Sequence, residues 1–467
     1  MRQDCIVVLD VGKTLAKLTL WSAGGQLVDR ATRPNERKLS RLGYPCLDVE
    51  GIEAWMASTL TSFARQKPIR AIVPVAHGAS GVILEPDGSW IAPLDYEAPL
   101  PDHLREQYVA SRDPFAETGS PALPGGLNFG AQLHWLEAIL PEAIQKGMIV
   151  NWPQFWAWRL SGVAATEVTS LGTHTDLWRP FEGRPSRLAE RRGWARRFAP
   201  LRRASDVLGP VTGIWRERCG LPESCMVVCG IHDSNADLLA VRTQIGDRDH
   251  TVLSTGTWFI AMRSCPNKPD LAALPEARDC LVNVNAFGIP VPSARFMGGR
   301  ETELLEDGAP LDPAAHRDAL LRRAEELAGA GVFALPSFQK GVGPYPALEG
   351  RWIGRPDDQV GRRAVAGLYL ALMANTSLDL IGSRERLVVE GRFIADPVFA
   401  RALASLRPEQ AVLLAPSSDS LCHGAISLAA PDIVFDSELF EVKPLPFDIA
   451  SYAIRWREQL VDATSAR

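Results

Sequence analysis

The sequence lacks the features that mark secreted, zinc-binding and membrane-spanning proteins. Its eight cysteines form no CxxC pair, and several stand in apolar surroundings, as in Cys225-Met-Val-Val-Cys229. Buried free thiols are therefore expected rather than disulfides or a zinc site. No apolar run approaches the roughly 20 residues of a membrane span, and the N-terminal residues run into a strand pattern without a signal-peptide core. We expect a cytoplasmic protein that does not bind a membrane.

An excess of positive charge is also missing. The 50 Lys and Arg residues are outnumbered by 55 Asp and Glu residues, which gives a formal net charge of −5. Nucleic-acid-binding domains are usually net basic, because contacts to phosphates supply most of their affinity. The densest basic stretch, 191–203, is interleaved with Trp194 and Phe198, a pattern typical of a solvated amphipathic helix. We therefore expect no nucleic-acid partner.

What the chain does have is the composition of an ordinary globular protein. Hydrophobic residues make up 46% and charged residues 22%, which is enough for well-packed cores. Its 467 residues exceed the ~250–300 at which a single hydrophobic core stops growing. We expect two domains, 1–243 and 244–467, with a cleft between them. A homodimer stays open, since nothing in the composition decides the assembly.

Strand-length apolar runs alternate with helical patterns, which predicts a mixed α/β fold. Residues 5–11 form a nearly continuous apolar run that ends at Gly12, and return strands are expected at 18–21 and 26–29. Helical spacing is found at 52–66, 130–145, 151–160 and 358–381, a strand pattern at 69–75, and Pro- and Gly-rich loops at 112–127 and 340–350.

A partial repeat links the two halves of the chain. The segment from Val8 to Thr14 is echoed by the segment from Val252 to Trp258, each an apolar strand that runs into a Gly-centred turn. Two similar domains would produce this pattern, although two unrelated hairpins could produce it by chance. A Gly at the tip of a turn lets backbone N–H groups and neighbouring hydroxyls approach a phosphate.

Two aspartates stand where a phosphoryl-transfer reaction would need them. Asp10 lies at the end of the first strand, where it can hold Mg²⁺ through water, and Lys13 and Lys17 can add positive charge. A plain hairpin with exposed lysines is the alternative. Asp233 follows the apolar run that breaks at Gly230, where it could accept a proton or simply cap the next helix.

At this point the chain resembles a known family, the FGGY carbohydrate kinases of the superfamily of sugar kinases, heat-shock chaperones and actin. Each motif is weak alone, but their order and spacing are specific and favour Asp233 as a base. The matching motifs are Asp10-Val-Gly12-Lys13-Thr14, Val75-Ala-His77-Gly78, Pro93-Leu-Asp95-Tyr96, Gly230-Ile-His232-Asp233, Ser254-Thr255-Gly256-Thr257-Trp258, Val388-Val-Glu390-Gly391-Arg392-Phe393 and His423-Gly424-Ala425-Ile426.

The resemblance implies two actin-like (ribonuclease H-like) α/β domains with the active site in the cleft between them, ATP and Mg²⁺ as cofactors, and a small sugar as substrate. It implies Asp233 as the general base and Asp10 as the residue near Mg²⁺. It assigns ATP binding to Gly12, Lys13, Thr14, Thr255, Gly256, Thr257 and Gly391. It assigns sugar binding to His77, Asp95, His232 and Asn285.

The substrate expectation comes from one motif. The segment from Gly230 to Ser234 is more similar to the corresponding motif of rhamnulose and fuculose kinases than to that of xylulose kinases. A 6-deoxy-ketohexose such as L-rhamnulose or L-fuculose is therefore expected first, and a pentulose such as xylulose or ribulose is the alternative. A regulator that binds nucleotide and sugar without catalysis is a further alternative, which the retained Asp10 and Asp233 argue against.

The chain also departs from the family pattern. Where relatives carry a run of glycines, Glu390 and Arg392 flank Gly391, which leaves the nucleotide preference open. Relatives have a Lys before the Trp of a helical segment, whereas this chain has Gln132 before Trp135. These departures predict a divergent branch of the family.

Overall fold

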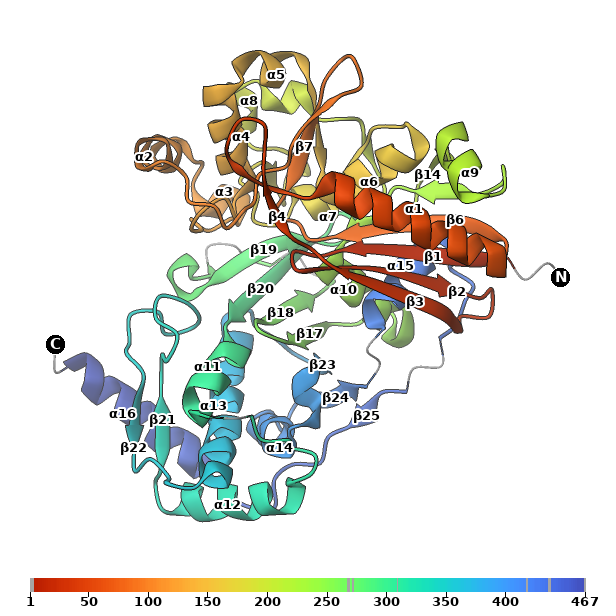
Figure 1. Cartoon of the computed structure of the whole chain (residues 1–467). Coiled ribbons are helices and arrows are strands. Elements are labelled where there is room, and N and C mark those ends of the chain that lie inside the picture. The colour runs from red at the N-terminus through yellow and green to blue at the C-terminus, as the bar shows by residue number, and fades with distance from the viewer. Residues whose placement is uncertain are drawn as a thin grey trace. The chain divides into compact units, whose positions relative to one another are not determined.

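Two compact units make up the part of the chain that the structure describes. The computed structural model describes residues 4–266, 269–270, 273–308, 310–416, 419–435 and 438–465. Unit 1 consists of Met1–Gly246, Val282–Val291 and Asp419–Asp436, and unit 2 of Asp247–Leu281, Pro292–Ser418 and Ser437–Arg467. Two segments from the second half of the chain thus belong to unit 1 (Figure 1). The two continuous ranges expected from the sequence do not include this exchange.

Unit 1 is built on a seven-stranded sheet with the order β14-β15-β6-β1-β2-β3, in which β16 also pairs with β6. The strands are β1 (Cys5–Val11), β2 (Leu15–Trp21), β3 (Leu27–Pro34), β6 (Ile69–Ala76), β14 (Val207–Pro210), β15 (Met226–Val228) and β16 (Ile231–His232). Smaller sheets contain β4 (Arg37–Leu39), β5 (Pro45–Leu47), β7 (Gly81–Leu84), β8 (Trp90–Ile91), β9 (Met148–Asn151), β10 (Thr166–Glu167), β11 (Trp178–Arg179), β12 (Arg184–Pro185) and β13 (Leu201–Arg202).

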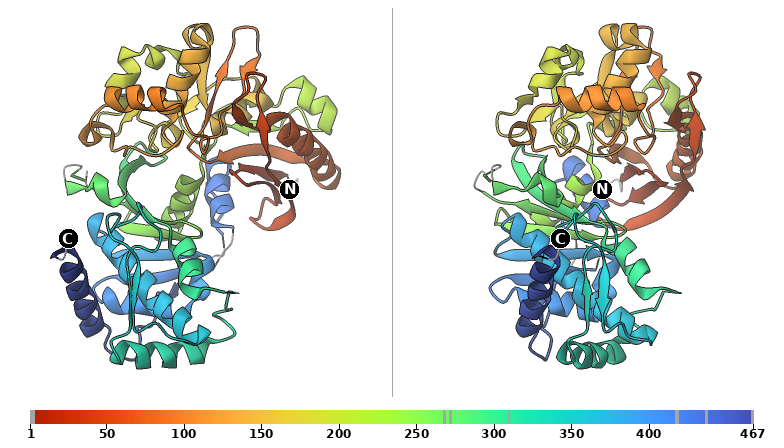
Figure 2. Two further views of the ribbon diagram at one scale, coloured as in Figure 1. Left: turned by 60° about the vertical axis from the view of Figure 1, so that its left-hand side comes forward. Right: turned by 90° about the vertical axis from the view of Figure 1, so that its left-hand side faces the viewer.

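The helices of unit 1 come from both halves of the chain. They are α1 (Val49–Gln66), α2 (Asp102–Ser111), α3 (Phe115–Thr118), α4 (Phe129–Ile139), α5 (Pro141–Lys146), α6 (Trp152–Ser161), α7 (Val168–Leu171), α8 (Arg187–Arg191), the 3₁₀ helix η1 (Trp194–Arg197), α9 (Gly213–Cys219), α10 (Asp233–Ile245) and α15 (Ser420–Ala429). Figure 2 shows α15, drawn in blue, beside α10, drawn in green, although they lie far apart in the sequence.

The side chains of β1 alternate between two helix layers. Val7 and Leu9 belong to the apolar cluster that contains side chains of α1 and α6. Ile6 and Val8 belong to the cluster that contains side chains of α10 and α15. Because successive residues of a strand point to opposite faces, a strand covered on both faces must be apolar throughout. This explains the nearly continuous apolar run at the start of the sequence.

Unit 2 contains most of a second seven-stranded sheet, with the order β19-β20-β18-β17-β23-β24-β25. The strands of this sheet are β17 (His250–Thr255), β18 (Phe259–Ser264), β19 (Cys280–Val284), β20 (Pro290–Phe296), β23 (Arg386–Gly391), β24 (Ala411–Ala415) and β25 (Phe440–Glu441), and the segment Val282–Val291 is the part that belongs to unit 1. Unit 2 also holds a separate strand pair, β21 (Phe333–Leu335) and β22 (Arg351–Ile353). Its helices are η3 (Glu276–Arg278), α11 (Gly298–Glu306), α12 (Arg317–Gly329), α13 (Gln359–Leu380), η4 (Arg392–Ala395), α14 (Pro397–Leu406) and α16 (Ala450–Ser465).

The two sheets share one strand order, which confirms the repeat predicted from the sequence. In both, three antiparallel strands are followed by two parallel ones: β3-β2-β1-β6-β15 in unit 1 and β20-β18-β17-β23-β24 in unit 2. Each begins with a hairpin that carries a glycine in its turn, Gly12 in the first and Gly256 in the second. The hairpins are therefore equivalent parts of two similar sheets.

Most expected helices and strands are present, and two differ. The helix expected over 130–145 is divided into α4 and α5 at Pro141, because proline has no N–H to continue a helix. The basic stretch forms α8 and η1 rather than one helix, and Gly193 between them has a φ of +75°. All eight cysteines lie among the described residues, are buried and form no disulfide, as expected. Within the described residues, no helix combines the length and apolar character needed to cross a bilayer.

Gly230 provides a test of how tightly the end of β15 packs against β6. Its φ is +87°, and a Cβ placed there would lie 2.2 Å from the Pro74 carbonyl oxygen. Gly88 has nearly the same φ, +86°, but a Cβ placed on it would meet no atom within 4 Å. The conformational penalty for alanine is therefore similar at both positions, whereas the steric overlap exists only at Gly230.

We predict that Gly88→Ala lowers the free energy of unfolding by about 1–2 kcal/mol through its left-handed backbone alone. Gly230→Ala is expected to lose about 2 kcal/mol more, because a backbone carbonyl cannot move aside cheaply. Denaturant unfolding followed by tryptophan fluorescence measures both variants. Equal losses of unfolding free energy for the two variants would show that the alanine methyl group at position 230 does not clash with the Pro74 carbonyl.

Candidate active site

Three segments of unit 1 end at one edge of its sheet because their strands run parallel. In the register of β1 and β6, Val11 is opposite Ala76, and in that of β16 and β6, His232 is opposite the same Ala76. The carboxyl ends of parallel strands meet at one edge, which is where α/β proteins place their ligands. Asp10, His77 and Asp233 lie at or directly after these strand ends.

Asp233 is the first residue of α10 and is not its N-cap, since His232 occupies that position. The capping interpretation of Asp233 therefore does not hold. Its Oδ1 accepts hydrogen bonds from the backbone N–H of Ser234 at 2.6 Å and the Ser234 hydroxyl at 3.2 Å. Although the side chain is 30% exposed, its packing against protein raises the pKa of the carboxyl to about 6. An unperturbed value near ~4 would have been expected from residue type alone.

His232 holds this carboxylate in place. The Asn235 side-chain amide donates to Nδ1 at 3.1 Å, so the hydrogen of the neutral ring is on Nε2, which lies 3.1 Å from Asp233 Oδ1. Burial lowers the pKa of His232 to about 4, which keeps the ring neutral. Each ring nitrogen thus has a polar atom of the protein 3.1 Å away, whereas the family resemblance implied a sugar contact.

Asp10 and Lys17 form the charged pair on the first hairpin. They are opposite each other in the β1–β2 register, and Lys17 Nζ lies 3.5 Å from Asp10 Oδ2. Burial raises the pKa of Asp10 to about 6, the Lys17 charge opposes this shift, and the negative charge of Asp233 adds to it. The two carboxylates therefore feel each other's charge, which is the environment in which a cation is favoured.

His77 is a buried histidine whose ring nitrogens have no hydrogen-bond partner in the described part of the chain. Its ring meets the Tyr96 ring edge-on at 5.2 Å, and burial lowers its pKa to about 3. The next residue, Gly78, has no room for a side chain, since a Cβ would lie 2.1 Å from Thr173 Cγ2 and 2.9 Å from His232 Cδ2. Three chain segments therefore converge beside His77.

Asp95, which precedes Tyr96, forms ion pairs with two cationic side chains. Lys13 forms an ion pair with its Oδ1, Arg37 Nε lies 2.6 Å from its Oδ2, and the backbone N–H of Glu97 donates to Oδ1 at 3.0 Å. Lys13 also lies over the Tyr96 ring, 4.7 Å from its centre. Lys13, which the family resemblance assigned to the phosphates, thus pairs with Asp95, which it assigned to the sugar.

The first Gly turn is closed by backbone hydrogen bonds. The N–H of Gly12 donates to the Leu15 carbonyl at 3.0 Å, and the side chain of Asn35 donates to the Gly12 carbonyl at 2.8 Å. A Cβ on Gly12 would lie 3.0 Å from the Leu15 carbonyl oxygen. Thr14 at this turn is exposed, so its hydroxyl is open to a ligand.

Asn285 organises the turn between β19 and β20, whose tip belongs to unit 1. Its Oδ1 accepts from the backbone N–H groups of Phe287 and Ile289, both at 3.0 Å. The same hairpin lies close to α7, since a Cβ on Gly172 would be 2.4 Å from Val284 Cγ2. The amide group assigned to the sugar therefore shapes its own turn.

The second Gly turn is in unit 2, between β17 and β18. The N–H of Gly256 donates to the Trp258 carbonyl at 3.0 Å, and Thr257 is exposed. The Thr255 hydroxyl donates to the Glu390 carbonyl and accepts from the Phe393 N–H at 3.2 Å. This buried hydroxyl ties β17 to the turn after β23, which leaves the exposed Thr257 as the hydroxyl that a phosphate could reach.

Gly391 lies close to the backbone of Thr255. Its φ is +87°, and a Cβ would lie 2.2 Å from the Thr255 carbonyl oxygen. The flanking Glu390 is buried and accepts a hydrogen bond from the Ser254 hydroxyl. The exposed Arg392 lies 5.1 Å from the centre of the Phe393 ring. The departures from the glycine run thus place one buried carboxylate and one exposed cation at this turn.

Sequence reasoning missed the support beneath His232. The buried Glu167 caps α7 by accepting from the Thr169 N–H at 2.9 Å and from the Thr169 hydroxyl. That hydroxyl in turn accepts from the His232 N–H at 3.1 Å, and burial raises the pKa of Glu167 to about 7. A glutamate two residues before Thr-Ser at a helix start was the available signal.

The comparison with known proteins agrees with these motifs. Residues 247–436 match the family model for the C-terminal domain of FGGY carbohydrate kinases. L-fuculokinase of Salmonella typhi is 24% identical over 279 residues, which cover 56% of this chain and 57% of that protein. L-fuculokinase of Escherichia coli K12 is also 24% identical, over 280 residues and the same shares of both chains. The chain thus spans little more than half the length of the curated relatives it matches.

Solved structures extend the match to the whole chain. A carbohydrate kinase from Novosphingobium aromaticivorans is 46% identical and has a TM-score of 0.95. The match covers 99% of this chain and 100% of that one. A xylulose kinase from Rhodospirillum rubrum is 19% identical with a TM-score of 0.78 and 98% coverage of both chains, which shows a shared fold. These likenesses confirm the predicted α/β class with two actin-like domains. The chain belongs to the FGGY carbohydrate kinase family.

Proposed function

We propose that the protein transfers the γ-phosphoryl group of ATP to a hydroxyl of a ketose, with Asp233 as the general base. The observation that carries this proposal is the Asp233 carboxylate, which lies 3.1 Å from His232 Nε2 at the carboxyl edge of the sheet and whose charge acts on Asp10. A binding protein without catalysis has no need of a carboxylate oriented in this way.

In the proposed reaction, a sugar oxygen bonds to the γ-phosphorus while the bond from that phosphorus to the leaving oxygen of ADP breaks. The hydroxyl proton passes to Asp233. Its Oδ1 is held by His232 and Ser234, and within the described residues no hydrogen bond engages Oδ2. With a pKa of about 6, the group is ionised at neutral pH and is a stronger base than an unperturbed carboxylate.

Asp10 is the proposed Mg²⁺ residue, and the residues present fit that ion. Two like charges near each other, Asp10 and Asp233, disfavour both being ionised unless a cation is present. Mg²⁺ typically binds one or two carboxylates and keeps several waters. When bound, it would neutralise charge on the phosphates. Lys17 supplies a fixed positive charge at the same carboxylate.

The nucleotide phosphates are assigned to the two Gly turns. Gly12 and Thr14 offer backbone and hydroxyl groups on the first turn, and Gly256 and Thr257 offer them on the second. In this proposal Gly391 allows the backbone after β23 to approach the nucleotide, while the Thr255 hydroxyl holds that backbone in place. Lys13 stays with Asp95 until a ligand competes for it.

For the sugar, a 6-deoxy-ketohexose such as L-fuculose or L-rhamnulose is the first proposal. The motif from Gly230 to Ser234 and the similarity to L-fuculokinases support it. A pentulose is the second proposal, since xylulose kinases share the fold. An assay of ADP release with a panel of polyols and ketoses, including L-fuculose, L-rhamnulose, xylulose and ribulose, tests the reaction and distinguishes the two substrate proposals. Absence of activity with every ketose and polyol tested would overturn the proposed reaction.

Replacing the base tests its role directly. We predict that Asp233→Asn folds and binds ATP and sugar but loses at least ~100-fold in kcat, as expected for a general base. Asp102 is a matched control, because it is also the first residue of a helix but is exposed on α2. Asp102→Asn should keep wild-type kcat. Near wild-type turnover in Asp233→Asn would remove Asp233 from the mechanism.

The raised pKa of Asp233 predicts a pH dependence. A carboxyl group with a pKa of about 6 is protonated below that pH and can no longer accept the sugar proton. We therefore expect kcat/KM for the sugar to be constant above pH 7 and to fall about tenfold per pH unit below pH ~6. Circular dichroism at each pH checks that the protein stays folded. A flat profile down to pH 5 would contradict the raised pKa.

Asp95 and Glu97 form a matched pair for testing the sugar site. Both carboxylates pair with Lys13 and Arg37, but the Asp95 side chain is 1% exposed and that of Glu97 is 49% exposed. Asp95→Ala is expected to raise KM for the sugar about 5- to 100-fold and KM for ATP much less. Glu97→Ala should change either constant less than about 2-fold. Equal increases for sugar and ATP would show that Asp95 does not belong to the sugar site.

A further inference from the structure

Thr173, in the loop after α7, lies where two segments of the candidate active site meet. A Cβ placed on Gly78 would lie 2.1 Å from Thr173 Cγ2 and 2.9 Å from His232 Cδ2. The Thr173 methyl group and the His232 ring therefore both pack against the Gly78 backbone. Thr173 is buried. Its methyl group thus borders the segment that carries His77, at the same glycine that the His232 ring contacts.

The backbone that follows Thr173 is strained at two residues. His174 has a φ of +35° and Asp176 a φ of +65°, a region that residues with a Cβ adopt only at an energetic penalty. Such conformations persist only where the surrounding structure holds them, and they are common at ligand-binding sites. The contacts of residues 174–176 show what holds this loop.

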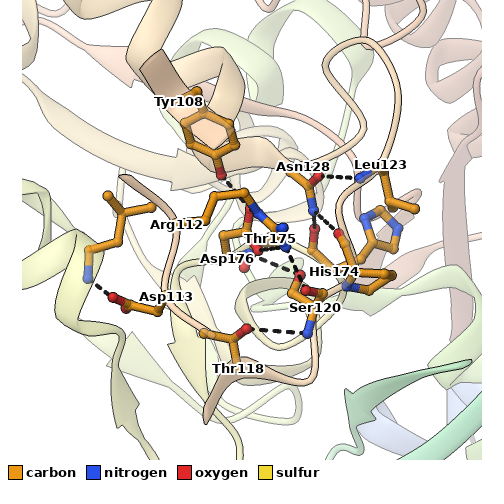
Figure 3. Close-up of polar contacts among 12 residues, drawn as sticks. Tyr108, Arg112, Asp113, Thr118, Ser120, Leu123, Asn128, His174, Thr175 and Asp176 are labelled. Atoms are coloured by element: carbon orange, nitrogen blue, oxygen red, sulfur yellow. Dashed lines mark hydrogen bonds and ion pairs between the residues drawn. The ribbon is translucent and has the colours of Figure 1, made fainter. Parts of the chain in front are cut away.

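On one side, Asn128 holds the backbone of His174. Its Nδ2 donates to the His174 carbonyl at 2.8 Å and to the Pro121 carbonyl at 3.0 Å, while its Oδ1 accepts from the Leu123 N–H at 2.9 Å (Figure 3). The His174 ring is fixed as well, since its Nδ1 lies 2.9 Å from the Leu127 carbonyl oxygen. The start of the loop is therefore tied to residues 121–128.

On the other side, a buried ion pair holds Asp176. Arg112 donates to both carboxylate oxygens at 2.8 Å, and the Tyr108 hydroxyl donates at 2.5 Å (Figure 3). The Asp176 N–H donates to the Ser120 hydroxyl at 3.1 Å. A bidentate pair of this kind restricts orientation as well as position. The loop is thus clamped three residues after Thr173.

We propose that Thr173 is a specificity-determining residue of the sugar site, and that Asn128 and the Arg112–Asp176 pair are positioning residues that press it against Gly78. This inference rests on the proposed ketose kinase activity. A wall that discriminates between sugars must be rigid, because a wall that yields to a larger or smaller substrate cannot reject it. The strained loop, held at its start and its end, provides that rigidity.

Thr173→Ser tests the wall itself, because it keeps the hydroxyl and removes only the methyl group that touches Gly78. One methyl group in a pocket changes discrimination between substrates substantially. We expect the ratio of kcat/KM between the preferred ketose and a ketose with one carbon more or fewer to change about 3-fold or more, with KM for ATP within 2-fold. The matched control is Thr59, a buried threonine on α1, and Thr59→Ser should leave the ratio unchanged.

Arg112→Lys tests the clamp, because lysine keeps the charge but cannot form the bidentate pair with Asp176. We expect KM for the preferred ketose to rise about 5-fold or more, while KM for ATP and kcat stay within 2-fold. The matched control is Arg263, which donates from Nε at 3.0 Å and from Nη2 at 2.5 Å to the two oxygens of Asp249 in unit 2. Arg263→Lys loses an equivalent pair and should leave both Michaelis constants unchanged.

The two variants report separately, so the inference does not depend on the folding of one of them. An unchanged substrate ratio in Thr173→Ser overturns it, whether or not Arg112→Lys folds. Equal increases in KM for sugar and ATP in Arg112→Lys would show a general loss of structure and overturn the positioning role. Both comparisons require an active wild type. If the wild type phosphorylates no sugar, the proposed function itself fails.

Discussion

The parallel pairing of β1 and β16 with β6 is the constraint on which the candidate active site depends. Ala76 is opposite Val11 on one side and His232 on the other, so the three strand ends are level. Asp10, His77 and Asp233 come from distant parts of the sequence and meet because of this register. A shift of one residue in either pair would turn the side chains to the opposite face of the sheet. The apolar clusters on both faces make such a shift costly.

In each unit, one glycine packs closely against the backbone of a neighbouring strand. Gly230 and Gly391 each have a φ of +87°, and in each case a Cβ would lie 2.2 Å from a backbone carbonyl oxygen of a neighbouring strand, that of Pro74 or that of Thr255. Gly230 follows β15 and Gly391 is the last residue of β23, so each lies at the end of a strand. Close backbone approach, rather than flexibility, is the reason that glycine is needed here.

Burial gives the site its chemical character. The same desolvation raises the pKa values of Asp10 and Asp233 to about 6 and lowers that of His77 to about 3. The carboxylates thereby favour a cation or a proton, and the histidine stays neutral as a hydrogen-bonding group. Lys13 and Lys17 already provide positive charge at Asp95 and Asp10. Each of these two carboxylates thus already has a cationic partner within unit 1.

The sequence by itself determined the α/β class, the repeat of two hairpins, the buried cysteines and the family. Periodicity and motif order are properties of the sequence, and they can be read without coordinates. Only the tertiary structure decided what each side chain does. In the structure Lys13 forms an ion pair with Asp95, and His232 Nε2 lies next to the Asp233 carboxylate. The Thr255 hydroxyl donates a hydrogen bond to the Glu390 carbonyl and so connects two strands. These outcomes depend on partners far away in the sequence and on desolvation, which no local pattern records. The exchange of Val282–Val291 and Asp419–Asp436 into unit 1 has the same origin, since packing rather than chain order decides where a segment is buried.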